Sequence, residues 1–136
     1  MELNELTLKQ EPIDVPMVTD KDGEPTDGFK VIGIHSDQYR DVARALAIRD
    51  YVRSAQREGP PIDAKTEEGA GEMLDQQIER EFEIARACIV EIYGFTKDGN
   101  PAPLDEQTLR TIFKARPTWQ AKVNAVIMSE ARFTNA

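Results

Sequence analysis

The chain has 136 residues, of which 17 are Lys or Arg and 25 are Asp or Glu, so its formal charge at pH 7 is −8. This length is typical of one domain with a real hydrophobic core, and we expect residues 1–136 to form a single domain. A pI near 4.7 argues against nonspecific nucleic-acid binding, because that binding depends on cationic side chains that displace counterions from phosphate. No apolar run has the length of a signal peptide or a membrane-spanning helix, so neither export nor membrane insertion is expected.

The first part of the chain, residues 1–35, has the pattern of β-structure. Alternating apolar residues predict two strands, at about 12–18 and 28–35, and the turn formers between them predict a hairpin. Pro16 has no N–H to donate to a neighbouring strand, so we expect the first strand to lie at an edge. A lone hairpin of this length is marginal in water, and it should therefore pack on helices.

Two long helices are predicted next. Ser36 is a good N-cap for the first, which should end before the Gly-Pro-Pro sequence at 59–61. The second should begin between residues 66 and 71. Apolar residues at three- and four-residue spacing form a stripe from Leu74 to Ile92, and this pattern predicts a central core helix that ends at Gly94.

Two shorter helices should complete a helical body over residues 36–133. Asp105 is a good cap for the third helix, and Pro117 predicts both its end and the first turn of the fourth. The expected fold class is therefore mainly α (α+β), with about four helices and a small N-terminal β-hairpin. We expect the first ten or so residues and the C-terminal tail to be disordered.

Residues for catalysis or metal binding are scarce. His35 is the only histidine and Cys88 the only cysteine, which leaves no disulfide and too few ligands for a zinc site. The loop at 20–23 lacks both end ligands of a calcium-binding loop, and no glycine-rich phosphate loop occurs. We therefore expect no enzyme activity, no cofactor and no metal.

Acidic residues crowd the first half of the second long helix. A solvated face is the favoured interpretation, and binding of a basic partner is the functional alternative. Trp119 and Phe133 each fit either a core position, which we favour, or an exposed interface anchor. The candidate protein-binding residues are Glu72, Asp75, Glu79, Glu83, Tyr93 and Trp119.

The order of motifs over Ala85–Phe133 is distinctive. An apolar helix is followed by an aromatic residue and glycine, an Asp-Gly-x-Pro-x-Pro-Leu loop, a short helix, a proline and a last helix. These places are taken by Tyr93-Gly94, Asp98-Gly99, Pro101, Pro103-Leu104, Leu109, Ile112-Phe113 and Pro117. Near the N-terminus, Gly28–Val31 and then Ser36–Arg40 form a strand followed by an S-x-x-Y-R helix start. Together these motifs resemble the tail assembly chaperones of long-tailed (siphovirus-type) bacteriophages.

The resemblance implies a nonenzymatic assembly factor that acts in the host cytoplasm and is missing from the mature virion. Such a protein binds the tape measure protein, keeps it soluble and promotes assembly of the tail tube protein around it. Self-association is also expected, whereas nucleic acid and membrane are not expected partners. The alternative is an acidic adaptor or inhibitor, such as a nucleic-acid mimic, which the charge of −8 favours and the interleaved arginines disfavour.

Overall fold

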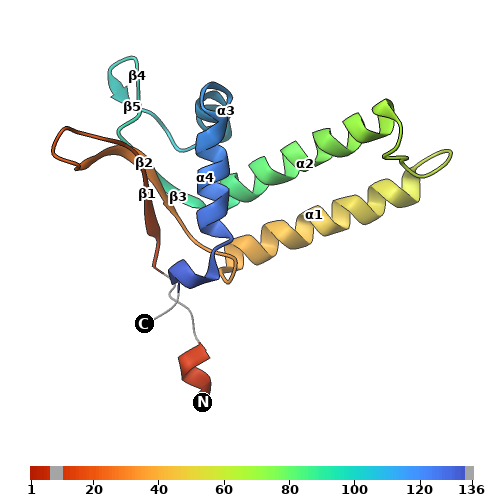
Figure 1. The fold of residues 1–136 in the computed structure, drawn as a ribbon, viewed down its shortest axis with the longest axis horizontal. Coiled ribbons are helices and arrows are strands. Elements are labelled where there is room, and N and C mark those ends of the chain that lie inside the picture. Colours follow the sequence, from red (N-terminus) through yellow and green to blue (C-terminus); the bar gives the residue numbers. More distant parts are fainter. Residues whose placement is uncertain (7–10, 134–136) are drawn as a thin grey trace.

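The structure, a computed structural model, describes residues 1–6 and 11–133 (Figure 1). Over these residues the fold is α+β and mainly helical, with four α-helices and a small antiparallel sheet near the N-terminus, and the predicted fold class is confirmed. A 3-10 turn, η1 (Leu3–Leu6), is exposed at the N-terminal end. The predicted disorder falls in part on residues 7–10 and 134–136, which lie outside the described residues.

Three helices begin where Ser36, Asp105 and Pro117 predict, and the second long helix begins within its predicted range of 66–71. Their bounds are α1 (Asp37–Gln56), α2 (Glu67–Cys88), α3 (Glu106–Ala115) and α4 (Pro117–Ile127). The side chains of Ser36, Thr66 and Asp105 each accept a hydrogen bond from a backbone N–H in the first turn, which satisfies one of the free donors at that helix end. Pro117 is the first residue of α4, where its missing N–H removes no helical hydrogen bond.

The sheet has the order β1–β2–β3, formed by β1 (Ile13–Thr19), β2 (Pro25–Val31) and β3 (Ile89–Tyr93). The prediction that the strand with Pro16 lies at an edge is confirmed, and the pairing register shifts directly after this proline. The central strand β2 begins and ends earlier than its predicted range of 28–35, because it pairs with β1 across a tight turn closed by Asp20.

The prediction that α2 continues to Gly94 is wrong. The helix ends at Cys88, and the next five residues form β3, which pairs with β2. Ile89 and Ile92 continue the helical spacing of α2, but the segment is rich in β-branched residues, and the free edge of β2 offers it hydrogen-bond partners. Ile92 pairs with Phe29 in this register, so it takes a place in the sheet instead of in the apolar stripe of a longer helix.

The core lies between the sheet and the helices. Phe29 of β2 is fully buried, and its ring lies 5.4 Å from the ring of Phe95 and 5.5 Å from that of Phe113 in α3. Helix α4 contacts β1, β2 and α2 and buries Val123 and Ile127. After the short turn η2 (Glu130–Phe133), the ring of Phe133 is buried beside His35, 5.1 Å between centroids.

Helices α1 and α2 form an arm that extends away from this body (Figure 1). Only the C-terminal part of α2 enters the core, where Phe82, Ala85 and Cys88 are buried. Leu74 and Ile78 are more than half exposed, so their predicted core positions are wrong. They lie on the core-facing stripe of α2 but beyond the end of the body.

The loop between β3 and α3 contains a hairpin that the sequence analysis did not predict. Its strands are β4 (Thr96–Lys97) and β5 (Asn100–Pro101), and Asp98 and Gly99 between them both have positive φ, as a tight hairpin turn requires. Gly94, which follows β3, also has a positive φ of 85°.

Gly94 and Gly99 offer a matched test of this loop. Their φ angles are 85° and 83°, so Gly→Ala imposes similar backbone strain, about 1–2 kcal/mol, at either position. A Cβ at position 94 would also collide with the backbone of Thr26 and with Asp27, whereas a Cβ at position 99 meets nothing within 4 Å. We expect Gly94→Ala to lower the free energy of unfolding clearly more than Gly99→Ala, measured by urea denaturation. Equal losses would contradict this packing.

Candidate protein-binding site

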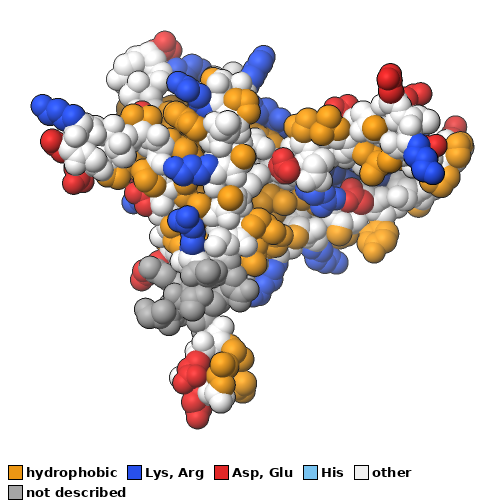
Figure 2. Space-filling model, viewed as in Figure 1, with side chains coloured by type: hydrophobic (Ala, Val, Ile, Leu, Met, Phe, Trp, Pro, Cys, Tyr) orange, Lys and Arg blue, Asp and Glu red, His pale blue; other side chains and the backbone are white. Residues whose placement is uncertain are grey.

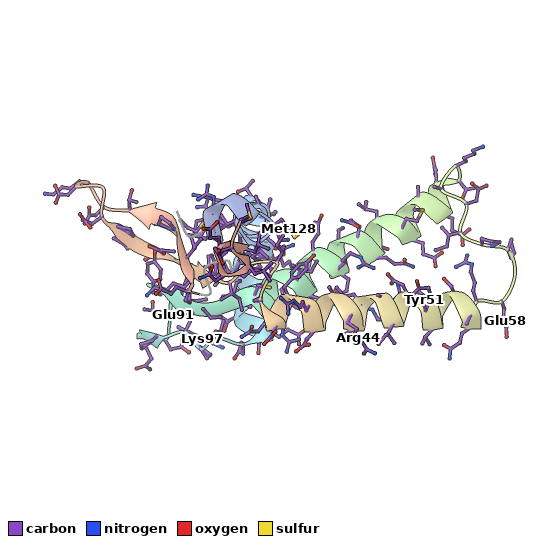
Figure 3. The ribbon with its side chains drawn as sticks, turned by 90° about the horizontal axis from the view of Figure 1, so that it is seen from below. Arg44, Tyr51, Glu58, Glu91, Lys97 and Met128 are labelled. Atoms are coloured by element: carbon purple, nitrogen blue, oxygen red, sulfur yellow. The ribbon has the colours of Figure 1, made fainter. Side chains whose placement is uncertain are left out.

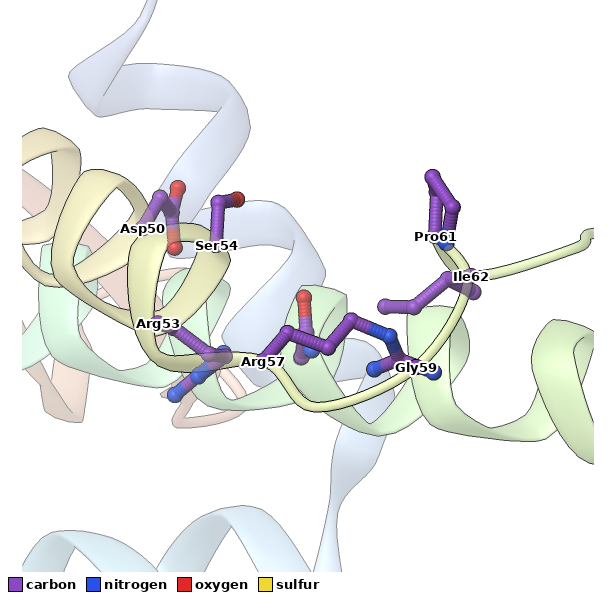
Figure 4. Close-up of a pocket in the computed structure, with 8 residues that line it drawn as sticks. Asp50, Arg53, Ser54, Arg57, Gly59, Pro61 and Ile62 are labelled. Atoms are coloured by element: carbon purple, nitrogen blue, oxygen red, sulfur yellow. The ribbon is translucent and has the colours of Figure 1, made fainter.

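The seam between the two helices of the arm is polar. An ion pair joins Asp50 of α1 to Arg80 of α2, and a second joins Arg57, just after α1, to Glu72 of α2 at 2.9 Å. Nearer the tip, polar side chains line a cavity of about 400 Å³ together with Pro61 and Ile62 (Figure 4). The two ion pairs therefore make the polar contacts of this seam, and nearer the body Leu46 of α1 is buried.

The apolar residues of α1 lie on the opposite side of that helix. Ile48 and Val52 stand two residues before and after Asp50, and each helical residue turns the chain by roughly 100°, so both point away from α2. Tyr51 lies three residues after Ile48, and 79% of it is exposed. Figure 3 labels Tyr51 on α1 with Arg44 nearer the body. We call Ile48, Tyr51 and Val52 the α1 outer edge.

The same rule places the exposed apolar residues of α2. Ile78 stands two residues from Arg80 and Leu74 two residues from Glu72, so both point away from the seam. They precede buried Phe82 by four and eight residues and so share its stripe. Exposure is 58% for Leu74 and 53% for Ile78. We call Leu74 and Ile78 the α2 outer edge.

Away from the body, the arm thus has charged side chains in its seam and apolar side chains on its outer sides, whereas apolar stripes meet in the seam of an ordinary helical hairpin. Nearer the body, Leu46 is the buried apolar residue of α1 and lies on the same side as Asp50. Figure 2 shows hydrophobic side chains on the surface of the arm. Exposed apolar side chains grouped on one element are typical of a surface that binds another polypeptide. The arm is therefore the candidate binding site.

The two helices of the arm differ in charge. Helix α1 has four arginines and three aspartates, whereas α2 has seven acidic residues and two arginines. Within the described residues, no ion pair engages the guanidinium groups of Arg44, Arg49 and Arg53. Asp75 and Glu81 of α2 are exposed and likewise form no ion pair there. The site therefore has a nearly neutral side, on α1, and a strongly acidic side, on α2.

The structure separates the four acidic residues that the sequence analysis singled out. Glu72 pairs with Arg57, and Glu79 pairs with Arg110 of α3 at 3.1 Å. Asp75 is exposed and Glu83 is half-buried. Two of the four therefore hold the arm and α3 in place, and Asp75 is the one that lies open to a partner.

Tyr93 lies away from the arm, on β3. Its hydroxyl donates a 2.6 Å hydrogen bond to Oδ1 of Asp14 in β1, and so links the two outer strands across β2. Desolvation by burial, the hydrogen bond to Asp14 and the negative charges of Asp14 and Asp27 raise the pKa of Tyr93 to about 12. This contact stabilises the sheet.

Trp119 is half-buried against the core, with its ring 6.2 Å from that of Phe95 and 5.4 Å from the guanidinium carbon of Arg116. The six candidates therefore do not form one site. The α1 outer edge was not predicted from the sequence, although Ile48, Tyr51 and Val52 form a second stripe, at i, i+3 and i+4 spacing, that could have indicated it.

The only cysteine and the only histidine lie in the body. Cys88 is fully buried, and desolvation raises the pKa of its thiol to about 12. No group of three or more His, Cys, Asp or Glu among the described residues is placed to hold a metal ion. In the same part of the chain, every helix is too short or too polar to span a bilayer.

Comparison with protein-family models finds no match to the chain, and comparisons with curated proteins and with solved structures find no significant match either.

The contact between Tyr93 and Asp14 predicts an alkaline transition. The fold favours the protonated phenol, so this contribution to stability is present below the usual tyrosine pKa of 10.0 and is lost as the pH rises through about 12. In an absorbance titration of tyrosinate, we expect an ionisation near pH 12 that Tyr93→Phe removes and Tyr51→Phe leaves intact. Asp14→Asn should move it to lower pH. Persistence of the step in Tyr93→Phe would assign it elsewhere.

The polar seam predicts that the arm opens more readily than the body, because an exposed ion pair contributes only about 0–1 kcal/mol. In native-state hydrogen exchange, we expect the protection factors of backbone amides in residues 48–56 and 70–78 to be at least about tenfold lower than those in β2 and α4. Equal protection in the two parts would show that the seam is as stable as the core.

Proposed function

We propose that the protein is an assembly chaperone that binds an amphipathic helical segment of a client on the α2 outer edge. The observation that carries this proposal is the exposure of Leu74 and Ile78 on the stripe whose next residue, Phe82, is buried in the core. A helix with its own apolar stripe would cover these side chains in the manner of a helix bound to a groove.

The charges beside this edge define the client further. Asp75 and Glu81 are exposed on the same helix as Leu74 and Ile78. A client helix with Lys or Arg next to its apolar stripe complements both features, and the charges would speed encounter and fix its orientation. Two half-exposed apolar residues support only modest affinity, so several copies bound along a long client would act by avidity.

The client that fits this description best is the tape measure protein of a long-tailed bacteriophage. The order of motifs over Ala85–Phe133 supports this choice, because it resembles the tail assembly chaperones. In this proposal the protein acts in the host cytoplasm without catalysis. It keeps the tape measure protein soluble until tail tube subunits assemble around it, and it does not remain in the virion.

The test is coexpression with a fragment of the tape measure protein of the same phage. We expect the wild-type protein to raise the soluble yield of the fragment and to be captured with it. The double variant Leu74→Gln, Ile78→Gln should bind the fragment at least about tenfold more weakly, because it removes the apolar side chains that the client covers.

Leu104→Gln is the matched control, since Leu104 is 43% exposed but lies in the loop before α3. It should bind as the wild type does. Failure of the wild-type protein to solubilise or capture the fragment would contradict the proposed function. Equal binding by the double variant would place the site elsewhere, and capture of basic proteins that lack an apolar helix would favour an acidic adaptor instead.

A further inference from the structure

The apolar stripe of the α2 outer edge continues under the side chain of Arg110. Phe82 follows Ile78 by four residues, about 6 Å along the axis of α2, so a helix that covers Leu74 and Ile78 also reaches Phe82. Phe82 is only 4% exposed. Arg110 of α3 lies over its ring, with the guanidinium carbon 4.0 Å from the ring centroid. The third position of the stripe is therefore taken by a side chain of the same molecule.

Two carboxylates hold the guanidinium of Arg110 at this position. Its Nη2 donates a hydrogen bond to Oε1 of Glu79 on α2 at 3.1 Å. Its Nε and Nη2 donate to Oε1 of Glu106 on α3 at 3.0 and 2.9 Å. The ring face and both carboxylates attract positive charge, so together they suit the long side chain of a cation. We call Glu79, Phe82 and Glu106 the cation subsite.

The charges around the cation subsite favour a cation there. The carboxylates on the adjoining sides of α2 and α3 outnumber the cations. They are Asp75, Glu79, Glu83, Asp105 and Glu106, against Arg86, Arg110 and Lys114. Glu106 also pairs with Arg86 at 3.5 Å, whereas Glu83 forms no ion pair within the described residues. The surroundings of the subsite therefore attract a further cation from outside.

We infer that the cation subsite is part of the client site and that Arg110 occupies it until a client supplies a Lys or Arg of its own. The stem of that residue would lie on the ring of Phe82, and its charged group would reach Glu79 and Glu106. This inference rests on the proposed function, which gives the client an apolar stripe with Lys or Arg beside it. Arg110 is then an internal competitor at high effective concentration, and a client without such a cation does not displace it.

The contacts of Arg110 are of a kind that can exchange. Its side chain is 45% exposed, and the side chains of Glu79 and Glu106 are 42% and 43% exposed. Exposed ion pairs of this kind are weak, because water also solvates the separated charges well. A client cation can therefore replace Arg110 without leaving a charge buried and unpaired.

Binding of synthetic helices to the full chain tests the subsite. The probe is an amphipathic helical peptide of Leu and Lys, and its matched partner has Gln in place of every Lys. Competition by Arg110 lowers the affinity for the Lys helix by the fraction of time for which the subsite is free. In isothermal titration calorimetry, we expect Arg110→Ala to bind the Lys helix about three- to tenfold more tightly than the wild type, and the Gln helix about equally.

Arg86→Ala is the matched control. It removes the same charge and also frees Glu106, but within the described residues only Arg110 lies over the Phe82 ring. This control should bind the Lys helix within about twofold of the wild type. Arg110→Ala combined with Glu79→Gln should lose most of the gain, because a carboxylate that Lys would reach is then absent.

A second variant covers the case in which Arg110→Ala fails to fold. Arg110→Gln keeps a long side chain on α3 but removes its charge, and it should bind the Lys helix more tightly than the wild type does. Circular dichroism should show that each variant retains its helices.

No gain for the Arg110 variants, or an equal gain for the Lys and Gln helices, would overturn the inference. A gain of the same size in Arg86→Ala would overturn it as well, since net charge alone would then explain the binding. The tape measure fragment separates this result from the proposed function. Capture of the fragment without a gain for the Lys helix would leave the function in place. A gain without capture of the fragment would leave the inference in place and contradict the function.

Discussion

The polar seam of the arm is the constraint on which the binding surfaces depend. Asp50 pairs with Arg80 and Arg57 with Glu72 across the seam, which places those residues, together with buried Leu46, on the facing sides of α1 and α2. Because a helix turns by roughly 100° per residue, the apolar residues two positions away must face outward. Both outer edges of the arm follow from this one arrangement.

Helix α2 carries one apolar stripe, and the body covers only the C-terminal part of it. The stripe of α2 is buried at Phe82 and Ala85, where α4 and the sheet cover it, and it is exposed at Ile78 and Leu74, where the body ends. The buried part anchors the arm. Arg110 of α3 contacts α2 as well, because it forms an ion pair with Glu79 and its guanidinium carbon lies 4.0 Å from the centroid of the Phe82 ring. An anchored arm with an exposed apolar edge is what the proposed binding of a client helix requires.

Only the acidic composition of the candidate site could be predicted from the sequence. The excess of acidic residues on α2 is plain in the sequence, but which of them remain open depends on arginines from other elements. Arg57 lies 15 residues from Glu72 and Arg110 lies 31 residues from Glu79 along the chain. Tyr93 looked like an interface residue, yet its hydroxyl bonds Asp14, 79 positions away, inside the sheet. Contacts at such separations have no signature in local spacing.

The sequence by itself determined the helix starts and the fold class, because caps and prolines act on the backbone within one turn of where they stand. Ser36, Asp105 and Pro117 are cases of this kind. Tertiary structure decided that residues 89–93 become a strand, because the free edge of β2 gives this β-branched segment hydrogen-bond partners that compete with those of a continued helix. It also decided which part of the α2 stripe is covered, since burial depends on where the body ends and periodicity does not record that position.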